Sequence, residues 1–571
     1  MDLPSLGPQA GIWLGDIASG ALTTALLWPY IPSRTYWNCS WPMNRIDLED
    51  FNLQPFMNRR DALRLLAGTI PVAKLSQVLR PASFGLQTLQ SFQGTHASLA
   101  TYEIPQWFRD AKFGIWAHWG PQSAAEDGDW YARNMYMQGS EQYNYHVAHY
   151  GHPSKVGFKD IIPTWKATAF DPSHLVGLYK KAGAKYFVSM GVHHDNFDLW
   201  NSKHTRWSSV KMGPKIDVVA EFRKAAQKHG LYFGVSDHLW ISYKWFAVSH
   251  RSDSTGPLAG VLYDGTDLSN SDLYHSYSDP KLITAKLDWN EDGIPESWKA
   301  HWSERITDLI DQAQPDYLYS DGALPFGERG LQMAAHLYNL SAQRNGGRTQ
   351  AVYLSKRPED CAVGTCVLDH ERGVLDEISA NPWQADTCVG NWHYKRGIEY
   401  KTPKFVIDML VDVVSRNGNL MLNFPLPNNG MLDDQELHIL AEITDWMSVN
   451  GEAIYATRPW KTSGTGPSLN KSANKETNFN EKNRKDLIAE DIRFTTKGDI
   501  LYVLVMGIPE KKATVPLNAA NTTTVRKIAN VELLGHSGNI QWTQDENALT
   551  IQMPEAAPSK FAVAFKLRGA L

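Results

Sequence analysis

Apolar residues recur along the middle of the chain in two alternating patterns. Segments 175–182, 218–229, 302–313 and 406–414 carry apolar side chains at three- or four-residue intervals, which is typical of helices that bury one face. Between these segments lie short apolar runs that end in polar or turn residues, and such runs predict buried strands. We predict strands at 113–118, 185–192, 231–235, 317–320, 350–354 and 419–424.

The order of these elements and the residues that follow the strands indicate the fold. Strands that alternate with helices predict a parallel sheet with helical crossover connections. Histidines follow the first three strands, and Asp321 follows the strand at 317–320. Because barrel enzymes carry their chemistry at the carboxyl ends of the strands, this pattern favours an α/β fold with a (β/α)8-like catalytic barrel over an open doubly wound sheet. No glycine-rich phosphate loop follows these strands, which also disfavours a nucleotide-binding fold.

The character of the chain changes after the helical pattern at 433–449. Residues 463–490 are rich in Asn, Lys, Ser and Gly and predict a loop or linker. Short alternating apolar runs follow as far as residue 567, and they predict a small C-terminal β-sandwich. We therefore divide this part of the chain into a catalytic barrel at 101–462 and a β-sandwich domain at 463–571.

The amino-terminal part predicts export rather than catalysis. Residues 57–100 begin with the pair Arg59-Arg60 and a moderately apolar stretch, which resembles a twin-arginine signal and linker. We expect residues 1–56 to be an unstructured or mis-called extension, and the protein to be periplasmic or secreted by a bacterium. A basic helix face is the alternative explanation of the arginine pair. The apolar run at 21–31 is too short to cross a bilayer, so we expect no membrane span.

Composition narrows the possible partners. The 571 residues carry a net charge of −5 and a pI near 6.4, which gives no basic surface for nucleic acid. The 21 Trp and 23 Tyr residues suit either a large core or flat platforms for sugar rings. The four cysteines have no metal-ligand spacing; Cys361 and Cys366 could pair, but their spacing leaves this open.

The histidines at the strand ends allow two interpretations. His118, His193, His194 and His238 could form a metal centre. The adjacent pair His193-His194 argues against it, because neighbouring side chains on a strand point to opposite faces. We expect no metal and no cofactor, and instead neutral imidazoles that hydrogen-bond sugar hydroxyls.

Five segments resemble the α-L-fucosidases of glycoside hydrolase family 29. They are WFRDAKFGIWAHWG at 107–120, HHDNFDLW at 193–200, PDYLYSD at 315–321, NGNLMLN at 417–423 and NGEAIYATRPW at 450–460. The segments occur in the family's order, and the resemblance runs from about Trp107 to the carboxyl terminus. Within the second segment, Asn196 stands where the family usually has Gly.

The resemblance implies a retaining exo-α-L-fucosidase that removes terminal α-L-fucose from oligosaccharides or glycoconjugates. In such an enzyme Asp321 attacks the anomeric carbon and forms a glycosyl-enzyme ester. By motif position, the residues that bind the fucose hydroxyls are His118, Trp130, His193 and His194. Tyr319 stands where the family often has Trp, and His238 is a weaker match on the strand that precedes it.

The resemblance leaves the acid/base residue to be chosen. Many members carry it in a Trp-Glu pair, but this chain has Trp383-Gln384, and an amide cannot donate and recover a proton as a carboxyl group does. Other members use a Glu upstream, on a mobile loop, and Glu371 fits that place. Its neighbour Arg372 could hold a carboxylate or a sugar hydroxyl, or the two could form a surface ion pair. The reserve candidates for the acid are Asp369 and Asp386.

Two other functions remain open at this point. A catalytically silent fucose-binding protein could share the scaffold, and the absence of a carboxyl group opposite Asp321 would favour it. A hydrolase of α-L-galactosides is the second alternative, because an apolar pocket discriminates only modestly against an added hydroxyl group. The sequence makes no prediction about the oligomeric state.

Overall fold

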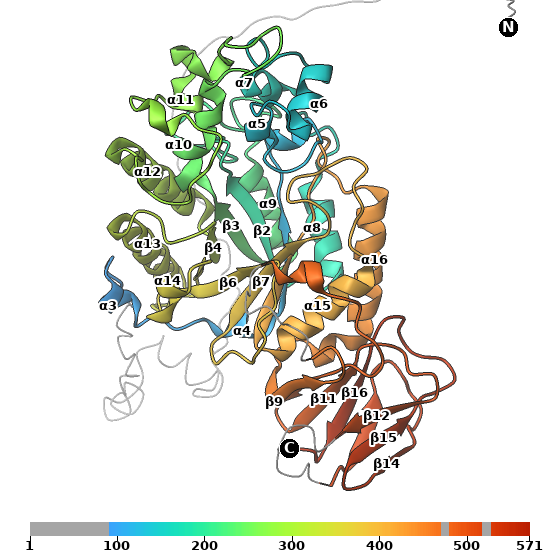
Figure 1. The fold of residues 1–571 in the computed structure, drawn as a ribbon. Helices are drawn as coiled ribbons and strands as arrows, with labels where there is room; N and C mark the ends of the chain where they lie inside the picture. The colour runs from blue at the N-terminus through green and yellow to red at the C-terminus, as the bar shows by residue number, and fades with distance from the viewer. Residues whose placement is uncertain (1–90, 470–478, 517–526) are drawn as a thin grey trace, which may run out of the picture. The chain divides into compact units, whose positions relative to one another are not determined.

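The structure is a computed structural model that describes residues 91–469, 479–516 and 527–571. The proposed extension at 1–56 and the arginine pair of the export signal lie outside the described residues. Within the described ranges, the chain forms an eight-stranded parallel barrel and a C-terminal pair of antiparallel sheets (Figure 1). The predicted fold class is therefore confirmed.

The barrel closes in chain order, with each strand beside its sequence neighbour and the last beside the first. Parallel neighbours of this kind require a crossover connection between each pair. The eight strands are β1 (Phe113–Ala117), β2 (Tyr186–Val192), β3 (Tyr232–Asp237), β4 (Tyr317–Ser320), β5 (Val352–Ser355), β6 (Val367–Glu371), β7 (Trp383–Cys388) and β8 (Gly418–Asn423).

The sequence patterns identified six of these strands and missed β6 and β7. Both missed strands mix polar and apolar side chains that are nearly all buried, so they lack the continuous apolar run of a buried parallel strand. One consequence concerns Glu371, which we expected on a mobile loop. It is the last residue of β6, paired in register with Asp386 of β7.

Four of the longer helices around the barrel begin at side-chain caps. Side chains of Asp171, Asp217 and Thr402 accept a hydrogen bond from the third residue of the helix that each one precedes. Asp433 and Glu436 form a capping box. The longer connecting helices are α8 (Pro172–Lys181), α9 (Val218–Lys228), α12 (Glu296–Ala313), α13 (Glu328–Arg344), α15 (Pro403–Ser415) and α16 (Asp434–Asn450).

Aromatic side chains fill the barrel interior beneath the carboxyl ends of the strands. Tyr186 and Tyr317 stack with ring centroids 5.6 Å apart, and Trp116 packs edge-on against Tyr319 at 4.9 Å. Gly114 makes room for this layer, since a Cβ atom there would lie 2.2 Å from the Tyr186 ring. The packed interior gives the site above it a rigid floor.

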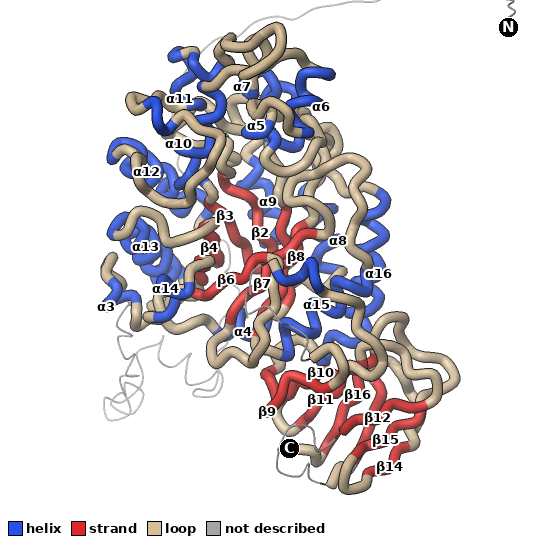
Figure 2. The backbone as a smooth tube through the Cα atoms, viewed as in Figure 1, coloured by secondary structure: helices blue, strands red, loops and turns tan. Residues whose placement is uncertain are grey.

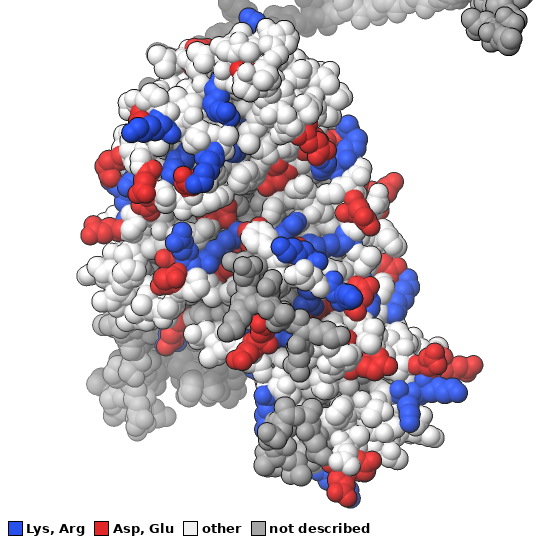
Figure 3. Space-filling model, viewed as in Figure 1, with Lys and Arg blue, Asp and Glu red and all other residues white. Residues whose placement is uncertain are grey.

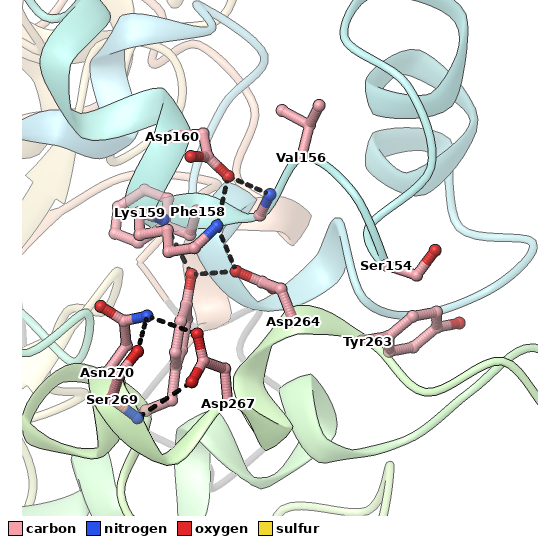
Figure 4. Close-up of polar contacts among 12 residues, drawn as sticks. Ser154, Val156, Phe158, Lys159, Asp160, Tyr263, Asp264, Asp267, Ser269 and Asn270 are labelled. Carbon is pink, nitrogen blue, oxygen red and sulfur yellow. Dashed lines mark hydrogen bonds and ion pairs between the residues drawn. The ribbon is translucent and has the colours of Figure 1, made fainter.

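The connections after β1 and β3 are long, and buried polar contacts join them. Asp264, in the connection after β3, accepts hydrogen bonds from Tyr136 at 2.7 Å and Tyr274 at 3.0 Å, and it lies 3.2 Å from Lys159 (Figure 4). A Cβ atom on Gly157 would overlap the Asp264 carboxylate, at 1.8 Å. The two connections therefore support each other above the barrel.

Two sheets that share one core form the C-terminal domain (Figure 2). One sheet has the order β13-β16-β11-β10-β9, and the other has the order β12-β15-β14. Strand β9 spans the boundary that we predicted at 462/463. The strands are β9 (Arg458–Thr465), β10 (Ile492–Lys497), β11 (Ile500–Val505), β12 (Lys512–Pro516), β13 (Asn530–Leu533), β14 (Trp542–Gln544), β15 (Ala548–Gln552) and β16 (Val563–Arg568).

Charged and polar contacts join this domain to the last two barrel helices. Arg493 of β10 donates to Asp412 of α15 at 2.6 Å, and Trp446 of α16 donates to the Ala562 carbonyl at 2.9 Å. Both Arg493 and Asp412 are buried, so their contact is shielded from solvent. Separating such a buried pair would leave a charge uncompensated, which costs free energy. The pair therefore holds the C-terminal domain against α15.

The face of the molecule drawn in Figure 3 shows no concentration of one charge. On the face drawn in Figure 3, Lys and Arg side chains are interspersed with Asp and Glu. Within the part of the chain that the structure describes, none of the helices combines the length and apolar character needed to cross a bilayer.

Candidate active site

The carboxyl ends of the barrel strands surround a cavity of about 560 Å³. This is the end of a barrel at which catalytic residues are found. Every site residue predicted from the sequence lines this cavity. These residues are Asp321, Glu371, His118, Trp130, His193, His194, His238, Tyr319 and Arg372.

Asp321 follows β4, and three basic side chains contact its carboxylate. Lys356 Nζ lies 2.7 Å from Oδ1, while His194 Nε2 and His238 Nδ1 lie 3.3 and 3.4 Å from Oδ2. Trp240 donates its indole N–H to the Asp321 backbone carbonyl at 2.6 Å. The carboxylate is thereby fixed in position at the wall of the cavity.

These contacts also set the charge of Asp321. Burial by itself would raise the pKa of this carboxyl group. The Lys356 ammonium and the hydrogen bonds from His194 and His238 outweigh burial and hold the pKa well below the usual value of 3.8. Asp321 is therefore an anion at neutral pH, as a nucleophile or an electrostatic stabiliser must be.

Lys356 joins Asp321 to the second carboxylate in the cavity. The same Nζ lies 2.5 Å from Glu371 Oε2, and Trp392 donates to Glu371 Oε1 at 3.0 Å. Both carboxylates contact one atom, so their nearest oxygens cannot be farther apart than the sum of 2.7 and 2.5 Å. Glu371 thus provides the carboxyl group opposite Asp321.

A second pair of carboxyl groups, Asp386 and Asp369, is fully buried beside Tyr319 and Gln384, and Asp386 also lines the cavity. Asp386 Oδ2 is 3.3 Å from the Tyr319 hydroxyl, and Asp369 accepts from Gln384 Nε2 at 2.6 Å. All three polar side chains are fully buried. Burial raises the pKa of Asp386 to about 7 and that of Asp369 well above its usual value. Gln384, which replaces a family Glu, also bonds Tyr186 and Tyr317 and so belongs to the barrel interior.

Amide side chains orient two of the histidines. The Nδ1 atom of His118 lies 3.0 Å from Asn423 Oδ1, and that of His193 lies 2.9 Å from Gln122 Nε2. Burial lowers the pKa of both rings well below 6.5, and neighbouring histidines lower it further. Both rings are neutral at pH 7 and can exchange hydrogen bonds with hydroxyl groups.

The adjacent pair His193-His194 does not obey the strand rule that we applied to it. Strand β2 ends at Val192, so both residues lie beyond the pleat and both line the cavity. Asn196 follows with φ of 60°, the left-handed conformation that Asn tolerates better than most residues and Gly adopts freely. This explains why Asn can stand where the family usually has Gly.

The histidines and carboxylates also meet a geometric requirement for metal binding. Three groups of side chains bring one potential ligand atom each to within 4.8 Å of one another: His118-His193-His238, Asp129-His193-His393 and His194-His238-Asp321. Burial keeps two of these histidines, His118 and His193, neutral. A neutral imidazole can bind a metal as well as a sugar hydroxyl. The predicted absence of a metal therefore stays a prediction.

Trp130 and Arg372, which both line the cavity, have strained backbones. Their φ angles are 61° and 49°, a region that non-glycine residues seldom occupy and that often marks functional sites. The Arg372 guanidinium donates to Gly390 at 3.2 Å and lies 3.3 Å from Glu481. No ion pair between Arg372 and Glu371 is found among the described residues; Arg372 holds the carboxylate of Glu481 instead, which disfavours the alternative of a surface pair with Glu371.

Several cavity residues were not predicted. Lys356 follows an ordinary buried strand, and only the regular placement of polar residues after strands could have indicated it. Trp289 and Phe479 are 40% and 49% exposed at the cavity. They come from a barrel connection and from the segment between β9 and β10, where no periodic pattern precedes them.

Comparison with known families decides the identity. A family model described as alpha-L-fucosidase matches residues 82–452, which is more than half of the chain. The chain belongs to the α-L-fucosidase family. The model of the family's C-terminal domain matches residues 484–568. The resemblance to glycoside hydrolase family 29 is confirmed, and so is the class of enzyme, a glycoside hydrolase.

Relatives in this family align over most of the chain. The tissue alpha-L-fucosidase of Homo sapiens is 25% identical over 489 residues, which cover 83% of this chain and 91% of that protein. The alpha-L-fucosidase of Branchiostoma floridae is 24% identical over 493 residues, 84% of this chain and 96% of that protein. The crystal structure of the Thermotoga maritima alpha-fucosidase in complex with a mechanism-based inhibitor aligns with a TM-score of 0.63 at 23% identity, over 84% of this chain and 100% of that one.

Proposed function

We propose that this α-L-fucosidase is an exo-acting, retaining enzyme in which Asp321 is the nucleophile and Glu371 the acid/base. Asp321 attacks the anomeric carbon while Glu371 protonates the departing oxygen. Glu371 then deprotonates the water that cleaves the glycosyl-enzyme ester. The substrate is a terminal α-L-fucoside of an oligosaccharide or glycoconjugate.

The contact of both carboxylates with Lys356 Nζ carries this proposal. Retaining glycosidases place their two carboxyl groups about 5–5.5 Å apart, and inverting enzymes place them about 6.5–9.5 Å apart to admit a water molecule. Contacts of 2.7 and 2.5 Å to one nitrogen atom keep the nearest oxygens of Asp321 and Glu371 closer together than the separation of inverting enzymes. A carboxyl group opposite Asp321 also disfavours a catalytically silent fucose-binding protein.

Position favours Glu371 over Asp386 as the proton donor. Both carboxyl groups line the cavity, but the side chain of Glu371 is 15% exposed, whereas Asp386 is fully buried and lies 3.3 Å from the Tyr319 hydroxyl. A general acid must reach the leaving oxygen directly or through one water molecule. Asp386 also has its pKa raised to about 7 by burial, so it remains the reserve candidate.

The cavity wall suits a single sugar unit. Trp116 and Tyr319 close the floor, where they belong to the packed barrel interior. His118, His193 and His194 present imidazoles to hydroxyl groups, and Trp130 offers a ring face. A closed floor with a polar wall supports removal of terminal residues.

One experiment tests reaction, substrate and stereochemistry together. Purified protein is given aryl α- and β-L-fucosides and aryl α-L-galactosides, and proton NMR follows the first sugar released. We expect turnover of the α-L-fucoside with α-L-fucose as the first product. β-L-Fucose first would refute retention, turnover only of the galactoside would change the substrate, and binding without turnover would indicate a fucose-binding protein.

We also propose that the enzyme is exported through the twin-arginine route. The Arg59-Arg60 pair motivates this, and the disulfide between Cys361 and Cys366 supports an oxidising destination. Replacing both arginines by lysine should retain the protein in the cytoplasm of the producing cell. Undiminished export of that double variant would refute the proposal.

A further inference from the structure

A short segment from outside the barrel lies against the end of the strand that carries Glu371. Residues 479–481 belong to the connection between β9 and β10. The backbone N–H of Phe479 donates to the Glu371 carbonyl at 2.7 Å, and that of Glu481 donates to the Arg372 carbonyl at 2.9 Å. The Asn480 side chain exchanges hydrogen bonds of 3.1 and 2.8 Å with the backbone of Val374. The segment is thus tied by hydrogen bonds to the end of β6 and to the three residues that follow it.

Glu481 anchors this segment from a buried position. It is 7% exposed, and its carboxylate lies 3.3 Å from Arg372 Nε and 2.9 Å from Lys401 Nζ, and accepts from Thr387 at 2.6 Å. Two cations and one hydroxyl group offset the cost of burying this charge. Removing the charge would leave the Arg372 and Lys401 cations without their shared partner.

Phe479 occupies the opposite side of the segment, at the mouth of the cavity. Its ring is 49% exposed although it lines the same cavity as Asp321 and Glu371. Trp289, which is 40% exposed, lines this cavity as well. Exposed aromatic rings at a sugar site offer apolar faces to the flat sides of a pyranose or aryl group.

We propose that residues 479–481 complete the leaving-group side of the active site. The Glu481 carboxylate, through Arg372 and Lys401, anchors the segment that bonds the backbone of Glu371 and Arg372, and so positions Glu371. Phe479 forms a wall against which the group leaving from fucose packs. The occupant of this wall is a pyranose ring or an aryl group. The inference rests on the proposed function, because it takes Glu371 as the acid.

Three substrates separate the two roles. The leaving group of phenyl α-L-fucoside is a ring that needs a proton donor. That of 2,4-dinitrophenyl α-L-fucoside is a ring that departs without protonation. α-L-Fucosyl fluoride has a leaving group with no ring and no need of a proton donor. The variants are Glu481→Gln, which keeps the shape of the side chain, Glu481→Ala and Phe479→Ala. Lys482→Ala is the matched control, because Lys482 is exposed in the same segment. Thermal unfolding shows that each variant is folded.

We expect Glu481→Gln to lower kcat/KM for the phenyl substrate about tenfold and to change the other two less than about twofold. A misplaced acid loses part of its contribution, and that contribution matters only where a proton is needed. Phe479→Ala should raise KM about fivefold for both aryl substrates, the worth of one aromatic contact, and leave the fluoride unchanged. Lys482→Ala should match the wild type with all three.

Other outcomes overturn the inference. An equal loss on all three substrates in Glu481→Gln would mean a merely structural role, and no loss at all would mean no role. An effect of Phe479→Ala on α-L-fucosyl fluoride would contradict the leaving-group wall, because this substrate carries no ring to pack against it. Glu371→Gln in the same assay distinguishes failure of the proposed acid from failure of the role of Glu481. If Glu371→Gln shows no dependence on the leaving group, Glu371 is not the acid. If Glu371→Gln shows this dependence and Glu481→Gln does not, only the role of Glu481 fails.

Discussion

The two carboxylates that face each other in the cavity are held by different parts of the molecule. Asp321 takes its contacts from His194, His238 and Lys356, which all follow barrel strands. Glu371 shares Lys356 but takes its other support from the Trp392 loop and from residues 479–481. Residues that follow barrel strands therefore fix Asp321, whereas the position of Glu371, the proposed proton donor, also depends on a segment from outside the barrel.

The most severe way to break this arrangement is to remove the anion. Asp321→Ala should lower turnover of phenyl α-L-fucoside and of the dinitrophenyl substrate alike, by roughly 10⁴-fold or more, because no covalent intermediate can form. Azide, which fits the vacated space, should restore part of the activity with the dinitrophenyl substrate. Turnover near the wild-type rate would sink the assignment of the nucleophile.

Removing the proton donor should have a smaller and more selective effect. Glu371→Gln should reduce kcat/KM for phenyl α-L-fucoside about 10²–10³-fold and affect the dinitrophenyl substrate much less, since only the first needs a proton. The alkaline limb of the pH profile should flatten. If Asp386→Asn shows this dependence on the leaving group and Glu371→Gln does not, the acid is Asp386.

Lys356 contacts both Asp321 and Glu371. Replacing it therefore tests how far Asp321 depends on this shared ammonium group. Its ammonium helps to hold the pKa of Asp321 low against the effect of burial, and so keeps the enzyme active as the pH falls. In Lys356→Met the pKa of Asp321 should rise, and the acidic limb of kcat/KM should move to higher pH. Lys356→Arg, which keeps the charge, should leave the limb closer to its original position.

The smallest expected effect concerns stability and tests the deeper carboxyl pair. Burial raises the pKa of Asp386 to about 7, so between about pH 4 and pH 7 the folded state binds more protons than the unfolded state. The free energy of unfolding therefore falls as the pH rises through this window. Asp386→Asn removes the titration, and its stability relative to the wild type should improve by on the order of 2 kcal/mol from pH 5 to pH 8. Urea unfolding at both pH values measures the difference, and a pH-independent difference would contradict the prediction.

The sequence predicted the surroundings of Asp321 better than those of Glu371, for a physical reason. Asp321, His193 and His194 each follow a strand with a clear apolar run, so local pattern places them at one edge of the barrel. Glu371 ends a strand whose polar residues are buried by partners from other strands, as with Asp369 and Gln384. Burial of that kind depends on tertiary contacts and leaves no periodic signal.

The same distinction applies to the fold. The barrel class followed from six strands with apolar runs, and the closed topology confirmed it. Strands β12 and β14 have five and three residues, too short for a periodic pattern. The segment at 479–481 gave no signal because its contacts with the end of β6 lie more than one hundred residues away along the chain, a distance at which sequence pattern carries no information about contact.

The placement of residues 479–481 has a consequence for how this fold can be recombined. The alpha-L-fucosidase model ends at residue 452, and the model of the C-terminal domain begins at residue 484. The segment beside Glu371, residues 479–481, therefore falls between the two models. Arg484, at the start of the second model, is tied to Asp412 of α15 at 2.7 Å. A chimera that exchanges C-terminal domains at these boundaries would exchange or lose contacts to the residues on either side of the Glu371–Arg372 bond. If Phe479 forms the proposed leaving-group wall, such a chimera would change the preferred leaving group while its barrel stayed the same.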